Sequence, residues 1–179
     1  MIFKQKIIRK KIFFFATAIA VAIVVADRLS KDMIIAALAS NSPTANGDYG
    51  KFDISRLLSI VLVWNRGGSF GVFANVRFIP AFLLVSALLT SALLIFLLWN
   101  SQSIGDGLYM SLILGGALGN ALDRILYGAV VDFIDIHLGQ YHWPSFNLAD
   151  SSIFCGAVLY LINDCLLTRK KRRNNSIPN

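Results

Sequence analysis

The sequence of 179 residues contains ten acidic side chains, and all of them are aspartates, because glutamate is absent. It has two cysteines, Cys155 and Cys165, whose placement in one apolar run provides neither a disulfide framework nor the spacing of a metal site. Charged residues make up 15% of the chain and hydrophobic residues 56%. So little charge and so much apolar surface exclude an ordinary soluble domain.

Two kinds of catalytic motif are also missing. The chain has no G-x-S-x-G sequence of the kind that presents a nucleophilic serine, and no glycine-rich loop that would hold a phosphate. We therefore look for chemistry in the aspartates, and we expect no cofactor.

The net charge of +7 comes largely from two basic clusters at the ends of the chain. Each cluster adjoins an apolar run, which favours contact with anionic lipid over nucleic-acid binding. The positive-inside rule then predicts that both clusters lie on the cytoplasmic side of the membrane. The first cluster contains Lys4, Lys6, Arg9, Lys10 and Lys11, and the second contains Arg169, Lys170, Lys171, Arg172 and Arg173.

The apolar residues form runs that predict an all-α membrane protein with four transmembrane helices. A cleaved signal peptide is an alternative for the first run, because a basic segment precedes it. However, this run continues into Asp27 and Lys31, which can pair at i,i+4 on a longer helix, and a retained helix fits better. We expect one integral membrane domain over residues 1–179. Its spans are predicted at about residues 12–28, 78–99, 108–126 and 151–168.

Four spans place both termini on the same side of the membrane, which the basic clusters identify as the cytoplasm. The two long connections, residues 27–77 and 123–150, would then lie outside. Leu57–Trp64 is rich in β-branched residues and too short to span, so it is either a strand or an interfacial segment. The turn Asn65–Gly71 could bring Val72–Phe73 back as a partner strand. We therefore expect a small extramembrane β-sheet over about residues 53–75, with the second connection as a loop or helix on the same outer surface.

One helical face of the third span combines small, polar and charged residues. Gly116 leaves room, Asn120 offers a donor and an acceptor, and Asp123 and Arg124 carry opposite charges. Ionisable groups near a membrane are costly, so they need partners or a function. A simple ion pair of Asp123 with Arg124 at a helix end is the structural alternative.

Asp132 and Asp150 flank the outer loop, and their surroundings differ. Asp132 is set among apolar residues, and partial desolvation raises the pKa of a carboxyl group. Asp150 lies where the fourth span begins, and the helix dipole favours its ionised form. Such asymmetry is what a general acid and a general base need. A mere helix cap at Asp150 is the alternative.

His137 and His142, with Asp135 nearby, are weak candidates for metal ligands because their spacing matches no strong zinc pattern. Tyr141 and Trp143 alongside favour an interfacial aromatic belt. We expect no metal site.

Five segments, in this order, resemble the motifs of signal peptidase II, the bacterial lipoprotein signal peptidase. Each motif is weak alone, but five in the right order are highly specific. They are Asp27–Lys31, Asn65–Phe70, Gly115–Arg124, Val130–Phe133 and Phe146–Ser151.

The resemblance implies a multi-pass aspartic endopeptidase of the bacterial cytoplasmic (inner) membrane with its active site near the outer face. It would cut prolipoproteins before a diacylglyceryl-modified cysteine, surrounded by membrane lipid, and globomycin-type inhibitors would target it. By matching positions, Asp132 and Asp150 would be catalytic. Residues that would bind substrate or support the site are Asn65, Gly116, Asn120, Asp123, Arg124, Asn147, Asp27 and Lys31.

Two rival functions come from other classes. A small transporter or channel subunit could use Asp123, Arg124 and Asp132 as an ion path, but these residues gather at span ends on one side. A non-catalytic membrane scaffold could use its aspartates only for capping and pairing, and it would tolerate Asp150→Asn.

Overall fold

The computed structural model describes residues 2–39, 50–67 and 78–175, and the side chains of residues 5–39, 50–67 and 78–166. Its helices are α1 (Ile2–Leu38), α2 (Ile79–Asn100), α3 (Ile104–Tyr127) and α4 (Leu148–Asn175), and its strands are β1 (Lys51–Asp53), β2 (Leu58–Asn65), β3 (Val130–Leu138) and β4 (Tyr141–His142). The chain is thus mostly helical, with a small antiparallel sheet, as the sequence predicts.

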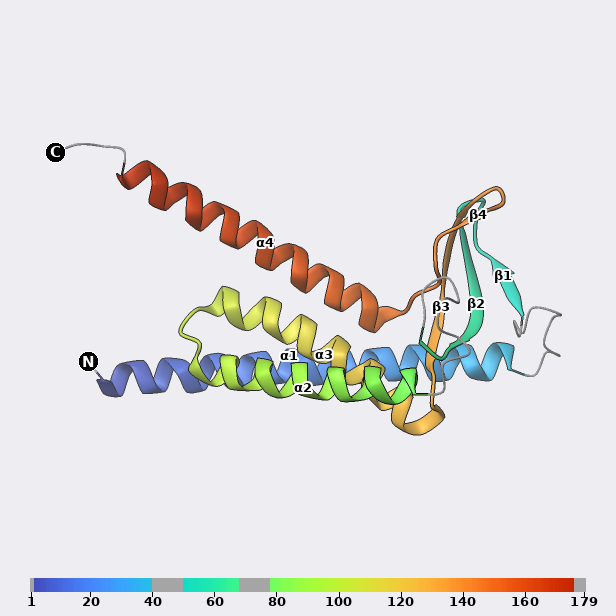
Figure 1. The fold of residues 1–179 in the computed structure, drawn as a ribbon, viewed down its shortest axis with the longest axis horizontal. Coiled ribbons are helices and arrows are strands. Elements are labelled where there is room, and N and C mark those ends of the chain that lie inside the picture. Colours follow the sequence, from blue (N-terminus) through green and yellow to red (C-terminus); the bar gives the residue numbers. More distant parts are fainter. Residues whose placement is uncertain (1, 40–49, 68–77, 176–179) are drawn as a thin grey trace.

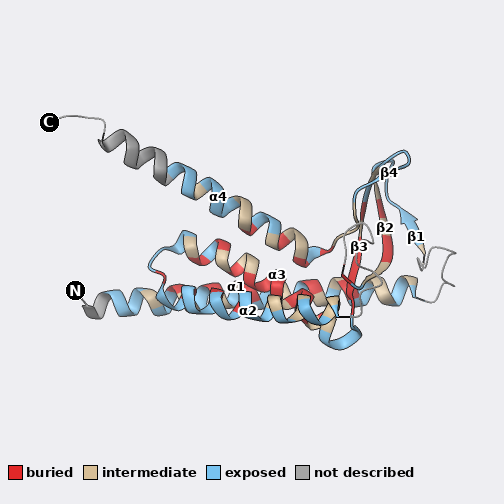
Figure 2. Cartoon of the chain, viewed as in Figure 1, coloured by how far each residue is buried: buried red, intermediate tan, exposed pale blue. Residues whose placement is uncertain are grey.

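A helix occupies each of the four predicted spans, but three of the described helices are long and apolar enough to cross a membrane: α1, α2 and α4. The helix α3 is not among them. Its glycines and the polar face around Asn120, Asp123 and Arg124 lower its hydropathy. These groups are buried or half-buried in the protein, where neighbouring helices rather than lipid meet them (Figure 2).

The helices run alternately up and down, so the start of α1 and the end of α4 both lie at the end of the molecule opposite to the sheet (Figure 1). Pro80 in the first turn of α2 suits a helix start because that turn needs no intrahelical N–H donor. Ser103 caps α3 by accepting a hydrogen bond from the N–H of Asp106. Gly128 ends α3 in the left-handed region, at φ 68°. It thereby turns the chain into β3.

Glycines let α1 and α4 pack closely on α3. A Cβ at Gly115 would lie 2.9 Å from the carbonyl oxygen of Ala20 in α1, and one at Gly156 would lie 2.8 Å from that of Tyr109 in α3. The Gly115–Gly119 pair therefore allows the close helix approach that its spacing predicts. The apolar core below it consists of Ala16, Ala20, Leu94, Leu98 and Leu114.

The sheet has the order β1-β2-β3-β4 and is antiparallel throughout. The segment predicted at residues 57–64 as a strand or an interfacial segment forms most of the strand β2. The partner of β2 is nevertheless β3, from a segment that we expected to be a loop or a helix. The apolar residues at the start of β3 explain this strand, since Val130 to Phe133 are all buried and both faces of the strand are covered there. The predicted return strand at Val72–Phe73 lies outside the described residues.

Candidate active site

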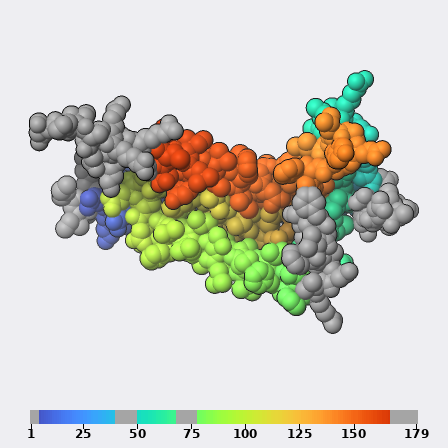
Figure 3. Space-filling model, turned by 45° about the horizontal axis from the view of Figure 1, so that its top comes forward, coloured from blue at the N-terminus to red at the C-terminus, as the bar shows by residue number. Residues whose placement is uncertain are grey.

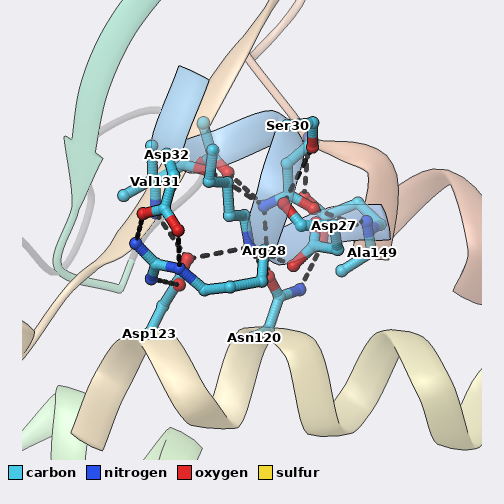
Figure 4. A network of polar contacts seen from close by, with 12 residues as sticks. Asp27, Arg28, Ser30, Asp32, Asn120, Asp123, Val131 and Ala149 are labelled. Atoms are coloured by element: carbon cyan, nitrogen blue, oxygen red, sulfur yellow. Dashed lines mark hydrogen bonds and ion pairs between the residues drawn. The ribbon is translucent and has the colours of Figure 1, made fainter. Parts of the chain in front are cut away.

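The ammonium of Lys31 is a fully buried cation, since the side chain is 0% exposed. Its Nζ lies 2.7 Å from Asp27 Oδ2, 2.7 Å from Asp123 Oδ2 and 3.2 Å from Asn120 Oδ1. The predicted i,i+4 pair of Asp27 with Lys31 is thus formed, within a larger network that joins α1 to α3 (Figure 4). Burial of this cation is compensated because oxygen atoms surround it.

Asp27 also holds the start of α4. Its Oδ1 accepts a hydrogen bond of 2.9 Å from the N–H of Ala149, while Gly119 leaves space for its Oδ2. A carboxylate at the N-terminus of a helix satisfies one of the free N–H groups there. The charged pair therefore fixes the position of the first turn of α4, which carries Asp150.

Asp123 is 1% exposed and pairs with α1 rather than with its neighbour Arg124. It contacts Lys31 and Arg28, and its Oδ2 accepts a hydrogen bond from the N–H of Val131 at the start of β3. The structural alternative, an ion pair of Asp123 with Arg124, is therefore wrong. Successive residues on a helix point in different directions, and Arg124 instead donates to the carbonyl oxygen of Asn120 at 3.2 Å.

Asn147, not Asp150, is the N-cap of α4. Its Oδ1 accepts from the N–H of Asp150 at 2.8 Å, and Asp150 Oδ2 in turn accepts from the N–H of Asn147 at 3.3 Å. This reciprocal arrangement is a capping box with aspartate at the third helical position. Asp150 thus lies inside the first turn, because α4 begins at Leu148, three residues before the predicted start.

Asn147 joins the two aspartates that the sequence singles out. Its Nδ2 lies 2.7 Å from Asp132 Oδ1, while its backbone N–H and side-chain oxygen bond to Asp150. On the other side of Asp150, Asn120 Nδ2 donates to Asp150 Oδ1 at 2.7 Å. Residues 18 positions apart in sequence therefore meet in one hydrogen-bonded group.

Asp132 is 2% exposed and lies on β3 beside β2. Asn65, at the end of β2, donates to Asp132 Oδ2 at 2.9 Å. Burial raises the pKa of Asp132 to about 7, and the charge of Asp150 adds to this rise against the lowering effect of the amide donors Asn65 and Asn147. The carboxyl group can consequently hold or lose a proton near neutral pH.

Nine of the ten residues singled out in the sequence belong to this connected group or face it. The half-buried Arg124 faces the group, because its guanidinium interacts electrostatically with both Asp150 and Asp132. Gly116 plays a different part from the expected one. It leaves no open space, because a Cβ there would overlap the carbonyl oxygen of Ala149, so the backbone of α4 already occupies that room.

We predict that Gly116→Ala pushes α4 away from α3 and lowers the free energy of unfolding by roughly 1–3 kcal/mol, with a parallel loss of activity. Gly105→Ala, in the first turn of α3, is the matched control, because its nearest neighbour would be Ser103 Oγ at 3.5 Å. Thermal unfolding of the two variants in detergent measures the difference. Equal unfolding temperatures would contradict the packing role of Gly116.

Sequence reasoning missed Arg28 as part of the site. Its guanidinium pairs with Asp32 and Asp123, donates to the Tyr127 hydroxyl at 2.7 Å and lies over the Tyr127 ring. The i,i+4 spacing of Arg28 and Asp32 was a usable signal for the first contact. The link to Tyr127 depends on how α1 meets α3, which spacing along the chain does not indicate.

The two histidines lie on the sheet, His137 on β3 and His142 on β4, and their hydrogen bonds do not join this group. His142 Nδ1 is 2.9 Å from both carboxylate oxygens of Asp135, and His137 Nε2 is 2.8 Å from Ser59 Oγ. Among the described residues no group of three or more histidine, cysteine or acidic side chains could hold a metal ion.

A hollow of about 490 Å³ lies beside Asp150, between the first turns of α4 and the strand β3 with its following segment. Figure 3 shows the concave surface where α4 meets this part of the sheet. Apart from Asp150 and Ser151, its lining is apolar or aromatic: Ile136, Trp143, Phe146, Phe154 and Cys155. The hollow can therefore accept apolar groups next to a carboxylate.

Residues 19–166 match the family model described as signal peptidase (SPase) II. A protein named lipoprotein signal peptidase from Anaplasma phagocytophilum is 38% identical over 133 residues, which is 74% of this chain and 83% of that protein. Another of the same name, from Polynucleobacter necessarius subsp. necessarius, is 40% identical over 148 residues, or 80% and 85% of the two chains.

A solved structure of a bacterial membrane enzyme superposes on 92% of this chain and 93% of its own, with a TM-score of 0.70 and 29% identity. A second such structure covers 83% and 91%, with a TM-score of 0.68 and 29% identity. Sequence and fold agree, and the chain belongs to the signal peptidase II family of membrane peptidases.

Proposed function

We propose that this chain is an aspartic endopeptidase that removes the signal peptide from prolipoproteins, cutting before a cysteine that carries diacylglycerol. The observation that carries the catalytic assignment is the bridge formed by Asn147 between the carboxyl groups of Asp132 and Asp150. Two carboxyl groups in one hydrogen-bonded cluster, of which one has its pKa raised to about 7, suit a pair that holds one proton.

In the proposed reaction Asp150 is the base and Asp132 the acid. The ionised Asp150 takes a proton from water, the resulting hydroxide attacks the scissile carbonyl carbon, and protonated Asp132 donates to the carbonyl oxygen. The tetrahedral diol then collapses. Asp150 passes its proton to the leaving nitrogen as the C–N bond breaks, and Asp132 recovers a proton from a diol hydroxyl.

The supporting residues have distinct parts in this proposal. Asn65, Asn120 and Asn147 orient the two carboxyl groups through the hydrogen bonds described above, and Asp27 with Lys31 fixes the helix start that carries Asp150. Arg124, half-buried near both aspartates, would bind the substrate backbone. The apolar hollow beside Asp150 would hold apolar parts of the substrate, and globomycin-type inhibitors would compete for the same site.

The membrane position follows from the same proposal. Three apolar helices would anchor the protein in the bacterial inner membrane, and α3 would be a fourth span shielded by its neighbours. Both termini would be cytoplasmic, and the sheet and the aspartate pair, at the other end of the helices, would then lie near the outer face. A substrate whose acyl chains stay in lipid could then enter from the side.

The test is cleavage of two synthetic precursors by the purified protein, followed by mass spectrometry. The precursors differ only in whether the cysteine at the cleavage site carries diacylglycerol. We expect release of the signal peptide from the modified precursor alone, with the new N-terminus at that cysteine. Equal cleavage of both precursors, or cleavage elsewhere, would reject the proposed specificity, and ion flux in liposomes without cleavage would favour the transporter alternative.

The protonation states predict a pH profile. Because Asp132 must enter the reaction protonated and has a pKa of about 7, kcat/KM should fall as pH rises through 7, by about tenfold for each further pH unit. Initial rates between pH 5 and 9 with the modified precursor measure this. A rate that rises across pH 7 would instead mean that ionised Asp132 is the active form, and it would reverse the assigned roles.

A further inference from the structure

A basic hollow of about 300 Å³ lies at the end of the molecule opposite to the sheet. It is formed by the N-terminal part of α1 and the C-terminal part of α2 and is lined by Gln5, Lys6, Arg9, Lys10 and Trp99. Lys6, Arg9 and Lys10 follow each other at i, i+3 and i+4, so three positive charges share one helical face.

These cations form no ion pair with an acidic side chain in the described part of the chain. No ion pair there involves Lys6, Arg9 or Lys10, and α2 contains no acidic residue. The first acid along α1 is Asp27, about 25 Å beyond Lys10 at the helical rise of 1.5 Å per residue. An anion from outside the chain would be the natural counter-charge.

Arg9 gives a second, independent indication of a ligand. Its Nε is buried and is the one buried side-chain nitrogen or oxygen atom among the described residues that lacks a hydrogen-bond partner. Leaving such a donor unpaired costs free energy, whereas an oxyanion in the hollow could accept from it. Arginine is suited to this role because its planar donors match the oxygens of phosphate.

The surroundings favour a lipid as the source of that oxyanion. The ring of Trp99 is held against Phe13 in an edge-to-face contact at 5.1 Å and is 55% exposed, which is typical of a tryptophan at the headgroup level. Exposed Phe14 and Phe96 continue the apolar surface along α1 and α2. A phosphate in the hollow could therefore keep its acyl chains along these helices.

We propose that this hollow is a binding site for the phosphodiester headgroup of an anionic phospholipid of the inner leaflet. The inference rests on the membrane orientation given under the proposed function. It goes beyond a general attraction of basic residues to the membrane, because it assigns the contact to one face of α1 and to Arg9.

Fluorescence of Trp99 provides the test. The chain has three tryptophans, so Trp64→Phe with Trp143→Phe leaves Trp99 as the single reporter in the full-length protein. This protein is placed in phosphatidylcholine bilayers that contain increasing fractions of a lipid with brominated acyl chains, which quench a nearby tryptophan. The brominated lipid is phosphatidylglycerol in one series and phosphatidylcholine in the other. We expect phosphatidylglycerol to reach half-maximal quenching at a clearly lower mole fraction.

Arg9→Gln and Lys11→Gln are the matched pair of variants. Both remove one positive charge from the same part of α1, but Lys11 lines a separate hollow with Ile8 and Phe15. Arg9→Gln should weaken the preference for phosphatidylglycerol about fivefold, and Lys11→Gln should leave it nearly unchanged. Equal losses in the two variants, or equal quenching by both lipids, would overturn the site.

Two further measurements identify the source of the phosphate and separate lipid binding from catalysis. Glycerol 3-phosphate at millimolar concentration should not displace the brominated lipid, and displacement would mean that the hollow binds free phosphate esters instead. Cleavage of the modified precursor is followed in the same bilayers with protein that keeps Trp64 and Trp143, because Trp143 lines the hollow beside Asp150. Active protein without a lipid preference would reject this inference alone, whereas a lipid preference without cleavage would reject the proposed function alone.

Discussion

Asp132→Asn and Asp150→Asn should each lower kcat/KM for the modified precursor by at least about a thousandfold. Asparagine keeps the size of the side chain but can neither release nor accept the proton that the reaction moves. Each variant thus removes one half of the acid–base pair. Quantified release of the signal peptide under single-turnover conditions measures the loss.

Asp135→Asn is the matched control for these two variants. Asp135 lies on the same strand as Asp132 and is similarly buried, at 4% exposure, but its carboxylate bonds to His142. We expect its activity to remain within about threefold of the original, because no group in the proposed reaction contacts it. Substantial cleavage by either Asp132→Asn or Asp150→Asn would refute the catalytic assignment, and a harmless Asp150→Asn would favour the scaffold alternative.

Lys31→Met should have the largest effect on folding, a loss of roughly 3–5 kcal/mol in the free energy of unfolding. Asp27 and Asp123 are each 1% exposed and have Lys31 as their shared ion-pair partner. Without its ammonium, the buried Asp27 would lose its ion-pair partner and the buried Asp123 would keep only Arg28. Denaturant titration of the protein in mixed micelles, followed by circular dichroism, measures the change.

Lys51→Met provides the comparison, because Lys51 also pairs with an aspartate, Asp53, at 3.1 Å, but both side chains are exposed. Such a surface pair should contribute less than about 1 kcal/mol. Adding Asp27→Asn and Asp123→Asn to Lys31→Met should recover part of the stability, since no buried charge remains. If Lys31→Met were as mild as Lys51→Met, or if the added changes made it worse, the network would not have the proposed role.

Local patterns are sufficient to predict the helices and the i,i+4 contact of Asp27 with Lys31. They work because helical periodicity and hydropathy act over a few residues. Leu57–Trp64 is recognisable as a strand candidate for the same reason. Its partner β3 cannot be recognised from the sequence, since a pairing across about 70 residues leaves no local signal. The turn that follows Trp64 instead suggests a hairpin with the next segment.

The meeting of Asp132 with Asp150 can be stated as a hypothesis from the sequence, but spacing alone does not establish it. Their link through Asn147 depends on the turn at Gly128 and on the capping box of Asn147, which advances the helix start by three residues. The role of Gly116 differs from the expected one for a related reason. A glycine on a helix indicates a close approach, and only the fold reveals that the approaching group is the backbone of α4.

Infrared titration of the carboxyl groups between pH 4 and 9 tests the central claim most directly, because it observes the proton on the aspartate pair itself. We predict a protonated carboxyl band that titrates with a pKa of about 7 and is absent in Asp132→Asn. In Asp150→Asn this pKa should fall, because the neighbouring charge that helps to raise it is gone. A band that is absent from the unmodified protein, or that titrates identically without Asp150, would contradict a proton shared by the two aspartates.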